Sequence, residues 1–471
     1  MEKAVSKVRT AKIELYRKQG KIHAKAVDGR FNRLRWAAVW LTQIIFYGAC
    51  WLQWTPADTP RQAILFDIAH EKLYLFGLVL WPQDALLLAI ALLLAALGLF
   101  FVTALAGRLF CGFACPQTVY TSIFVWIEAR IEGDHLARLK LDQSPLSARK
   151  LGLKTLKHGV WLLIAAWTGI TFVGYFTPIR ELLPSLAAWQ TGPWEAFWLI
   201  FYTAFTYVQA GLAREAVCQH MCPYSRFQGV MFDPATRQVG YDHQRGEPRA
   251  ARRQDKAAGD CIDCAICVEV CPTGIDIRNG LQYQCINCGL CIDACDQVMQ
   301  RLKLPTGLIR FASENELNLR SPLEPAVVPV VQEIAQKRPR IIIYASLIAA
   351  FTLLGAWTLS QRTLLVVDVW RDRGALLREM PDGRIENAYT LKLTNQADTP
   401  RRIEISADGL PGLEIIGARQ FDIPAGSIQP IQLTLAAPSS ANLSGLQPIA
   451  LEISSIQDGL RLRQPSRFAL P

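Results

Sequence analysis

The feature that most constrains this chain is a cysteine-rich stretch, CIDCAICVEVCPTGIDIRNGLQYQCINCGLCIDACD, which runs from Cys261 to Asp296. It contains two runs of cysteines with the same spacing, C-x-x-C-x-x-C-x-x-x-C, followed once by proline and once by Asp296. This is the pattern of bacterial two-cluster ferredoxins, in which the fourth cysteine of each run binds the cluster of the other run. A pair of four-cysteine zinc sites is the alternative, but zinc sites rarely repeat a third cysteine at this short spacing.

The spacing therefore assigns four cysteine ligands to each of two 4Fe-4S clusters. The first cluster site comprises Cys261, Cys264, Cys267 and Cys295, and the second cluster site comprises Cys271, Cys285, Cys288 and Cys291. Two such clusters in one compact fold form a path for electrons. Closely spaced thiols in this number also indicate a reducing compartment rather than a disulfide framework.

Long apolar runs elsewhere predict membrane spans, since about 20 residues of helix cross the hydrocarbon core of a bilayer. The five runs are Trp36–Trp54, Ala85–Gly107, Gly159–Tyr175, Trp194–Ala213 and Ile341–Leu359. We therefore expect a five-helix α transmembrane bundle. The basic residues up to Arg35 and the lack of a cleavage site after the first run indicate an anchor and not a cleaved signal peptide.

The distribution of basic residues predicts the orientation of these spans. Residues 1–35 contain eleven Lys and Arg and residues 108–157 contain eight, whereas residues 60–83 contain two. The positive-inside rule then places the N-terminus in the cytoplasm and the C-terminus in the periplasm. The formal net charge of +10 is accounted for by these loops, so we expect a lipid bilayer as partner and no nucleic acid.

Two further cysteine pairs follow the second and fourth apolar runs, in RLFCGFACP and REAVCQHMCP. The candidate site residues are Cys111, Cys115, Cys218 and Cys222, with His220 as an optional metal ligand. Each pair either shares one helix face or ends at a new helix that begins with the proline. The sulfurs could bind cuprous ion, hold a third Fe-S cluster or act as redox dithiols, and simple packing of free cysteines is the plainest alternative.

After the last apolar run, short alternating segments such as YTLKLT (Tyr389–Thr394) and IQLTLA (Ile431–Ala436) predict an antiparallel β-sandwich. We expect the following domains. They are a cytoplasmic basic segment (1–35), a four-span membrane domain with both C-x-x-x-C-P pairs (36–232), a cytoplasmic two-cluster α+β ferredoxin domain (233–320), a linker (321–340), a fifth transmembrane helix (341–360) and a periplasmic all-β domain (361–471).

This combination of paired C-x-x-x-C-P spans, ferredoxin insert, further span and β-sandwich resembles the bacterial cytochrome c oxidase accessory proteins of the CcoG/RdxA/FixG type. The resemblance covers nearly the whole chain. It implies an immunoglobulin-like fold for the C-terminal domain and a place in the inner (cytoplasmic) membrane. It also implies reduction of Cu(II) to Cu(I) for assembly of a cbb-type cytochrome c oxidase, with copper as substrate or transiently bound ion at the four membrane-face cysteines.

The partners expected from this resemblance are copper ion, an unidentified cytoplasmic electron donor, and oxidase assembly factors or a copper chaperone. A homodimer is also possible. Two rival functions remain. A quinol-linked electron-transfer subunit is suggested by the similarity of the thiol pairs and clusters to NapH-like nitrate-reduction proteins. A non-catalytic oxidase assembly scaffold is the other, and loss of Cys264 or Cys288 should matter less to a scaffold than to a reductase.

Overall fold

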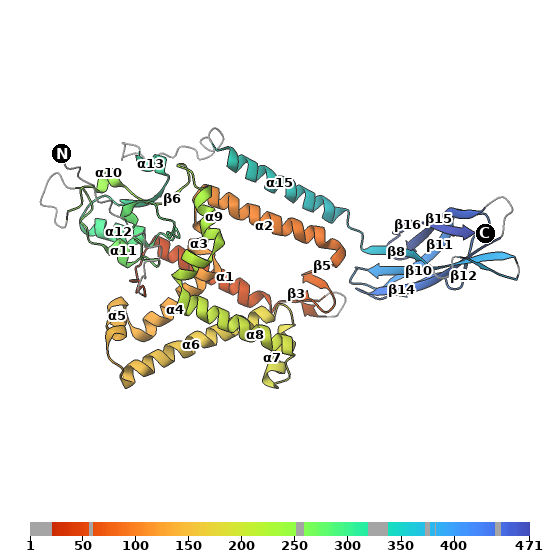
Figure 1. Cartoon of the computed structure of the whole chain (residues 1–471), viewed down its shortest axis with the longest axis horizontal. Helices are drawn as coiled ribbons and strands as arrows, with labels where there is room; N and C mark the ends of the chain where they lie inside the picture. The colour runs from red at the N-terminus through yellow and green to blue at the C-terminus, as the bar shows by residue number, and fades with distance from the viewer. Residues whose placement is uncertain are drawn as a thin grey trace, which may run out of the picture. The chain divides into compact units, whose positions relative to one another are not determined.

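The structure is a computed structural model that describes residues 21–55, 60–250, 259–318, 338–372, 377–381, 383–438 and 444–471 (Figure 1). The chain divides into two compact units. The first contains Met1–Ala49 with Leu93–Ala350, and the second contains Cys50–Leu92 with Phe351–Pro471. Most of the predicted linker 321–340, and the first twenty residues of the predicted N-terminal segment, lie outside the described residues.

Long helices make up most of the membrane domain. They are α1 (Arg30–Ala49), α2 (Ala85–Ala106), α4 (Pro116–Glu132), α6 (Ala148–Val173), α8 (Pro193–Thr206) and α15 (Pro339–Ser360). Within the described ranges, five segments are long and apolar enough to cross a membrane: Pro82–Ala106, Leu109–Glu132, Ala148–Val173, Pro193–Ala213 and Pro339–Ser360. Four of these coincide with predicted spans. The predicted run Trp36–Trp54 is helical only to Ala49 and is not among the five, whereas Leu109–Glu132 was not predicted.

The directions of three helices relative to the ferredoxin domain follow from contacts at their ends. The backbone N–H of Phe31, at the start of α1, donates to Asp293 across 3.1 Å. At the end of α2, the Leu105 carbonyl accepts from Arg237 N–H across 3.3 Å. Arg338, just before α15, donates to Asp233 across 3.0 Å. Helices α1 and α15 therefore lead away from the ferredoxin domain, and α2 leads towards it.

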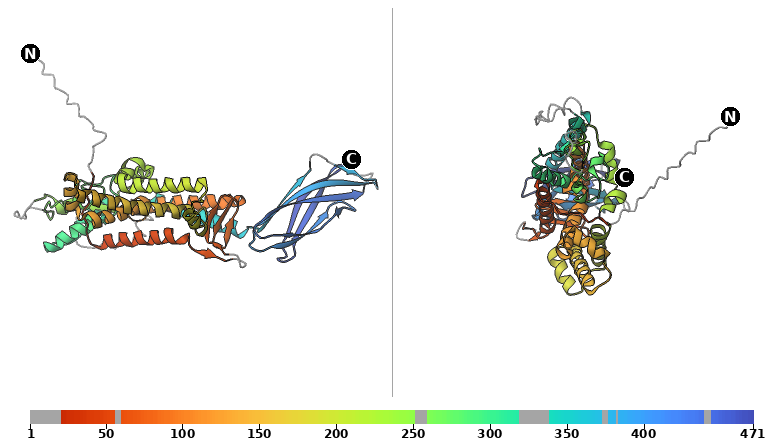
Figure 2. Two further views of the ribbon diagram at one scale, coloured as in Figure 1. Left: turned by 90° about the horizontal axis from the view of Figure 1, so that it is seen from below. Right: turned by 90° about the vertical axis from the view of Figure 1, so that its left-hand side faces the viewer.

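Helix α4 packs antiparallel against α6, with the short helix α5 (His135–Gln143) between them in sequence. The Trp161 indole donates to the Phe124 carbonyl across 3.1 Å, and farther along Lys157 pairs with Glu132 across 2.8 Å. The left view of Figure 2 shows α1, α6 and α8 running along a common direction. Further helices here are α7 (Ile179–Ala187) and the π-helical turn η2 (Tyr207–Ala213) that extends α8.

The ferredoxin domain is a small α+β fold. Strand β6 (Gln238–Tyr241) pairs antiparallel with β7 (Ile309–Ala312). Helices α11 (Ile266–Glu269) and α12 (Leu290–Arg301) each begin inside one of the two cysteine runs. Short helices α10 (His243–Gly246), η4 (Ile277–Asn279) and α13 (Glu314–Asn318) complete the described part. The interior apolar residues are Val239, Tyr241, Ile277, Ile292, Met299, Leu308 and Ile309. This small core holds the two cysteine runs against each other.

The C-terminal region is an antiparallel β-sandwich. One sheet has the order β12-β14-β10-β8, with β9 paired to β10, and the other has the order β13-β11-β15-β16. The strands are β8 (Leu365–Arg371), β9 (Arg378–Glu379), β10 (Arg384–Asn395), β11 (Arg401–Asp408), β12 (Glu414–Ile416), β13 (Gln420–Ile423), β14 (Ile428–Pro438), β15 (Gly445–Ser455) and β16 (Arg461–Leu470). Both predicted strand segments lie inside these strands, in β10 and β14.

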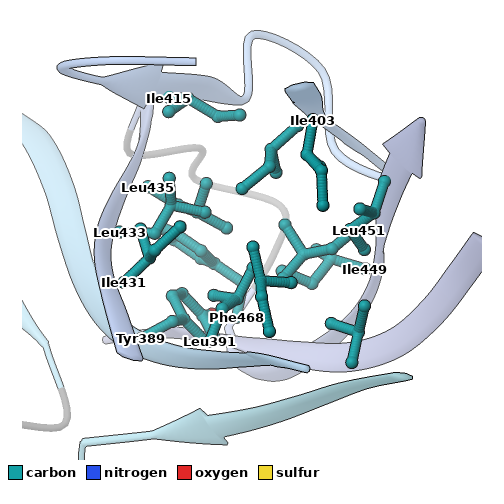
Figure 3. Close-up of a cluster of buried hydrophobic side chains, with 14 of the residues drawn as sticks. Tyr389, Leu391, Ile403, Ile415, Ile431, Leu433, Leu435, Ile449, Leu451 and Phe468 are labelled. Carbon is teal, nitrogen blue, oxygen red and sulfur yellow. The ribbon is translucent and has the colours of Figure 1, made fainter. Parts of the chain in front are cut away.

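Alternation of apolar and polar residues explains the core of this sandwich. Side chains such as Tyr389, Leu391, Ile403, Leu433, Leu451 and Phe468 point between the two sheets and are almost fully buried (Figure 3). Their burial removes a continuous apolar surface from water, which is the main favourable contribution to folding of such a domain. The predicted fold class is confirmed: a multi-pass helical membrane domain, a two-cluster ferredoxin insert and an immunoglobulin-like sandwich.

A three-stranded sheet between α1 and α2 belongs to the same unit as the sandwich. It consists of β3 (Ile64–Asp67), β4 (Lys72–Leu75) and β5 (Leu78–Leu80), and β1 (Gln53–Trp54) pairs with β2 (Arg61–Gln62) beside it. Arg61 donates to Asp398 of the sandwich across 2.7 Å. This ion pair joins the segment between α1 and α2 to the C-terminal domain.

Candidate iron–sulfur and thiol site

The structure brings together the four cysteines predicted for the first cluster site. They line one pocket together with Tyr241, Met299 and Arg278. Cys261 and Cys267 are buried, whereas Cys264 is exposed. Cys295 reaches this cavity from helix α12, a chain segment that belongs to the other cysteine run. The crossed assignment of the fourth ligand is therefore compatible with the fold.

The second cluster site has the corresponding arrangement. A second pocket is lined by Cys271, Cys285, Cys288 and Cys291, and Cys267 of the first site also borders it. Shared lining by Cys267 shows that the two cavities are neighbours. Apolar side chains such as Ile275, Ile286 and Leu290 complete the wall.

Left-handed backbone conformations shape both cysteine loops in the same way. Asp263 and Asn287, which precede the second cysteine of each run, have φ of 54° and 55°. Ala265 and Gly289, which follow that cysteine, have φ of 56° and 76°. Alternating conformations of this kind curl the chain into a concave loop. The loop geometry therefore repeats as closely as the cysteine spacing does.

The chemistry of the donors fits a pair of 4Fe-4S clusters. Each cavity is lined by the four cysteines predicted for its site, and four thiolates are the usual ligand set for such a cluster. Burial raises the pKa of the Cys267 thiol to about 11 and that of the Cys285 and Cys295 thiols to about 12. Because the thiolate is the form that binds iron, cluster binding at these residues must release protons.

Each of the two C-x-x-x-C-P pairs has its cysteines on either side of a helix boundary. Cys111 lies in the short helix α3 (Leu109–Phe113), and Cys218 lies in the π-helical turn η3 (Val217–Met221). Cys115 and Cys222 have extended backbones and precede α4 and α9 (Pro223–Met231) as N-cap residues. Of the two geometries that the sequence left open, the structure has the new helix that begins with proline.

The four membrane-face thiols share one neighbourhood. Cys111, Cys115 and Cys222 are all within electrostatic reach of Cys218. The Cys111 thiol donates to the buried Gln228 side chain across 3.5 Å. His220 lies exposed in η3. In the described part of the chain, no three His, Cys, Asp or Glu side chains are close enough to form a site for a single metal ion.

Helix α3 places the first thiol pair directly beside the second cluster site. A Cβ atom at Gly112 would lie 2.7 Å from the Ile286 carbonyl oxygen and 3.1 Å from the Cys288 Cα. Cys111 packs into the apolar cluster that contains Ile286 and Cys288. The side-chain amide nitrogen of Asn287, in this loop, lies 2.7 Å from where a Cβ atom at Gly107 would be. The second cluster site is therefore next to the thiols.

Four residues of this region were not predicted as site residues. Gln228 contacts Cys111, and Asn287 accepts from Val239 N–H across 3.3 Å. Arg35 and Arg108 are buried polar side chains near the second cluster site. Spacing gives no signal for Gln228 or Arg35, because the contacts join segments far apart in sequence. Arg108 precedes its cysteine pair closely, but a basic residue there is also a usual membrane anchor.

Comparisons with known proteins agree with these parts. A family described as "4Fe-4S dicluster domain" matches residues 213–314, and one described as "4Fe-4S binding domain" matches residues 88–133. A third, "IG-like fold at C-terminal of FixG, putative oxidoreductase", matches residues 355–471.

The chain is also similar to whole proteins. It is 38% identical over 423 residues to the nitrogen fixation protein FixG of Rhizobium meliloti, which covers 84% of this chain and 81% of FixG. It is 38% identical over 435 residues to the protein RdxA of Cereibacter sphaeroides, covering 91% of this chain and 92% of RdxA. A crystal structure of a FixG-related protein from Vibrio parahaemolyticus is 22% identical, covers 23% of this chain and 98% of that chain, and has a TM-score of 0.22.

Fold and site together define a membrane-associated iron–sulfur redox protein with a role in electron transfer. Within that class, the chain belongs to the FixG/RdxA family of membrane ferredoxin-type proteins. The resemblance inferred from the cysteine pattern is thereby confirmed.

Proposed function

We propose that this protein reduces Cu(II) to Cu(I) at the four membrane-face thiols, and so supports assembly of the copper centre of a cbb-type cytochrome c oxidase. The observation that carries the proposal is the contact between α3 and the Ile286–Cys288 loop. Cys111 lies on the membrane-domain side of that contact, and the second cluster site lies on the other. An electron acceptor bound by the thiols would therefore be next to the electron source.

The residues around the thiols suit this chemistry. Thiolates are soft ligands that favour cuprous over cupric ion, so ligation by them makes the reduction more favourable. The Arg108 guanidinium is within electrostatic reach of Cys111, Cys218 and Cys222, and its charge stabilises thiolate over thiol. Gln228 holds the Cys111 side chain in place. When bound, 4Fe-4S clusters supply single electrons, and one electron converts one cupric ion to cuprous ion.

We further propose the orientation and partners of the protein. The basic loops favour a cytoplasmic ferredoxin domain, which gives an unidentified cytoplasmic donor access to the exposed Cys264. The opposite directions of α1 and α2 support this arrangement, because both then meet the ferredoxin domain on one side. The sandwich would then be periplasmic, where it could meet an oxidase assembly factor or a copper chaperone.

The test is anaerobic reduction of cupric ion by purified protein that has been reduced with dithionite and desalted, followed with a cuprous-specific chelator. The test variant replaces Cys111, Cys115, Cys218 and Cys222 with alanine, and the matched control is Cys50→Ala, a buried cysteine outside both sites. We expect the quadruple variant to keep its iron but to reduce copper much more slowly than the control. Equal rates would mean that the clusters react with copper directly, and the quinol-linked or scaffold function would then be favoured.

A third cluster at the four thiols is a second candidate. The observation that favours it is the "4Fe-4S binding domain" match over residues 88–133, whose only cysteines are Cys111 and Cys115. Two cysteines are too few for a cluster, but Cys218 and Cys222 would complete the set. Iron analysis separates the candidates, since about eight iron atoms per chain indicate two clusters and about twelve indicate three.

A further inference from the structure

Two buried arginines from the membrane domain lie beside the second cluster site. Arg108, which is 3% exposed, donates to the carbonyl groups of Tyr283 and Ser225, and its Nη1 atom is 3.5 Å from the Cys285 carbonyl oxygen. Phe31, one turn before Arg35 in α1, packs against Gly289, the residue after Cys288, where an added Cβ atom would lie 2.6 Å from its ring. Arg35 is 8% exposed, and its charge is within electrostatic reach of Cys288 and Cys271. Both positive charges are thus held in a low-dielectric region next to ligands of the same site.

Neither charge is offset by an ion pair within the described residues. The Arg35 side chain donates to the Ser122 hydroxyl across 2.7 Å, and Arg108 donates to backbone carbonyls. Asp293 is a buried carboxylate on helix α12, which contacts α1. Its two oxygens accept the Phe31 and Asn32 backbone N–H groups across 3.1 and 2.7 Å, as a cap on helix α1. Asp293 is thus engaged by the helix N-terminus and not by the arginines.

The first cluster site differs in this respect. Arg278 lines its cavity, but this arginine pairs with Asp276 across 2.7 Å and also with Asp263. Asp296, which directly follows the ligand Cys295, adds a negative charge on the same side. The positive charge near the first site is therefore balanced by carboxylates, and that near the second site is not.

We propose that Arg35 and Arg108 raise the reduction potential of the cluster at the second site, so that an electron resides there, beside Cys111, in preference to the first site. Reduction adds one negative charge to a cluster, and a buried positive charge nearby stabilises the reduced form. Transfer between the sites moves a single electron, oxidising the first cluster and reducing the second, with no bond made or broken. The inference rests on the proposed function only in naming copper at the thiols as the acceptor to which the second cluster passes its electron.

The test is a redox titration monitored by electron paramagnetic resonance on the purified, cluster-loaded protein, with Arg35→Gln and Arg108→Gln as variants. Comparison with Cys264→Ser, which alters the first site, assigns the two midpoints. We expect each glutamine variant to lower the reduced-to-oxidised ratio of the second cluster about tenfold at a fixed potential, or about 59 mV for one electron. The first cluster should shift much less. No copper is needed, so the result is independent of the copper proposal.

Three controls keep the test decisive. Arg35→Lys and Arg108→Lys retain the charge and should restore the midpoint. Arg237→Gln, on the exposed pair with Glu316, should leave both midpoints unchanged. If an arginine variant fails to load iron, Ser122→Asp would neutralise Arg35 in place and should lower the second midpoint, whereas Ser122→Asn should not. The proposal is overturned if both clusters shift equally, if neither shifts, or if lysine shifts the midpoint as much as glutamine.

Discussion

The contact between α3 and the second cluster loop can be probed at Gly112. A methyl group there would lie 2.7 Å from the Ile286 carbonyl oxygen, whereas ordinary contacts begin at 3.4 Å, so α3 and the loop must separate by about 0.7 Å. Overpacking of this kind costs about 1–3 kcal/mol. A backbone oxygen cannot turn aside as the end of a flexible side chain can, so we expect little relief.

The matched control is Gly152→Ala in α6, where nothing lies within 4 Å of the new methyl group. Alanine is favoured over glycine inside a helix by about 1 kcal/mol, so this control should be as stable as the wild type or more stable. We expect Gly112→Ala to be less stable than Gly152→Ala by about 1–3 kcal/mol. It should also reduce cupric ion more slowly, because the thiols move away from the second site.

Thermal unfolding of the cluster-loaded protein in detergent, followed by bleaching of the iron–sulfur absorbance, ranks the two variants. Copper reduction is measured on the same preparations, with rates expressed per bound iron. If Gly112→Ala matches Gly152→Ala in both unfolding temperature and rate, the close packing of α3 on the loop does not hold, and the argument that carries the copper proposal fails.

Three other predictions concern the loops, the thiols and the charged interior. Ala265→Gly should raise the unfolding temperature, since alanine at φ 56° costs about 1–2 kcal/mol. Gly289→Ala should lower the unfolding temperature, because its methyl group would lie 2.6 Å from a phenylalanine ring. The reverse order of unfolding temperatures would contradict the loop geometry. Without iron, thiols such as Cys267, with a pKa raised to about 11, are protonated at both pH 6 and pH 8. Cluster reconstitution therefore releases protons and should be more complete at pH 8 than at pH 6. Equal iron loading at the two pH values would refute this. Glu128→Ala removes a fully buried carboxylate that pairs with Lys21, Lys157 and Arg214. In thermal unfolding it should destabilise the protein by about 3–5 kcal/mol. A loss of stability below about 1 kcal/mol would show that the three cations find other partners.

Local sequence patterns determined much of this protein because their information is contained in short segments. The repeated cysteine spacing predicted the ferredoxin domain, since three of the four cysteines assigned to each cluster lie in one short segment of the chain. Alternation in segments such as Tyr389–Thr394 predicted the strands, because side chains alternate between the two faces of a sheet. The length of the apolar runs predicted four of the five membrane-spanning segments found in the described residues. The predicted end of the first span was less accurate, since the helix ends at Ala49 and residues 53–54 pair with 61–62 as strands.

Other features were decided only by the tertiary structure. The short spacing of Cys111 and Cys115 fitted two local geometries, and the choice of a helix that begins at Pro116 is seen only in the fold. Which cluster lies beside the thiols depends on the packing of Gly112 against a loop more than 170 residues later. The placement of Arg35 beside the second site likewise joins distant segments. The sequence therefore predicted which cysteines could be ligands, and long-range packing decided how these cysteines are arranged in space, because such contacts leave no periodic signal in the chain.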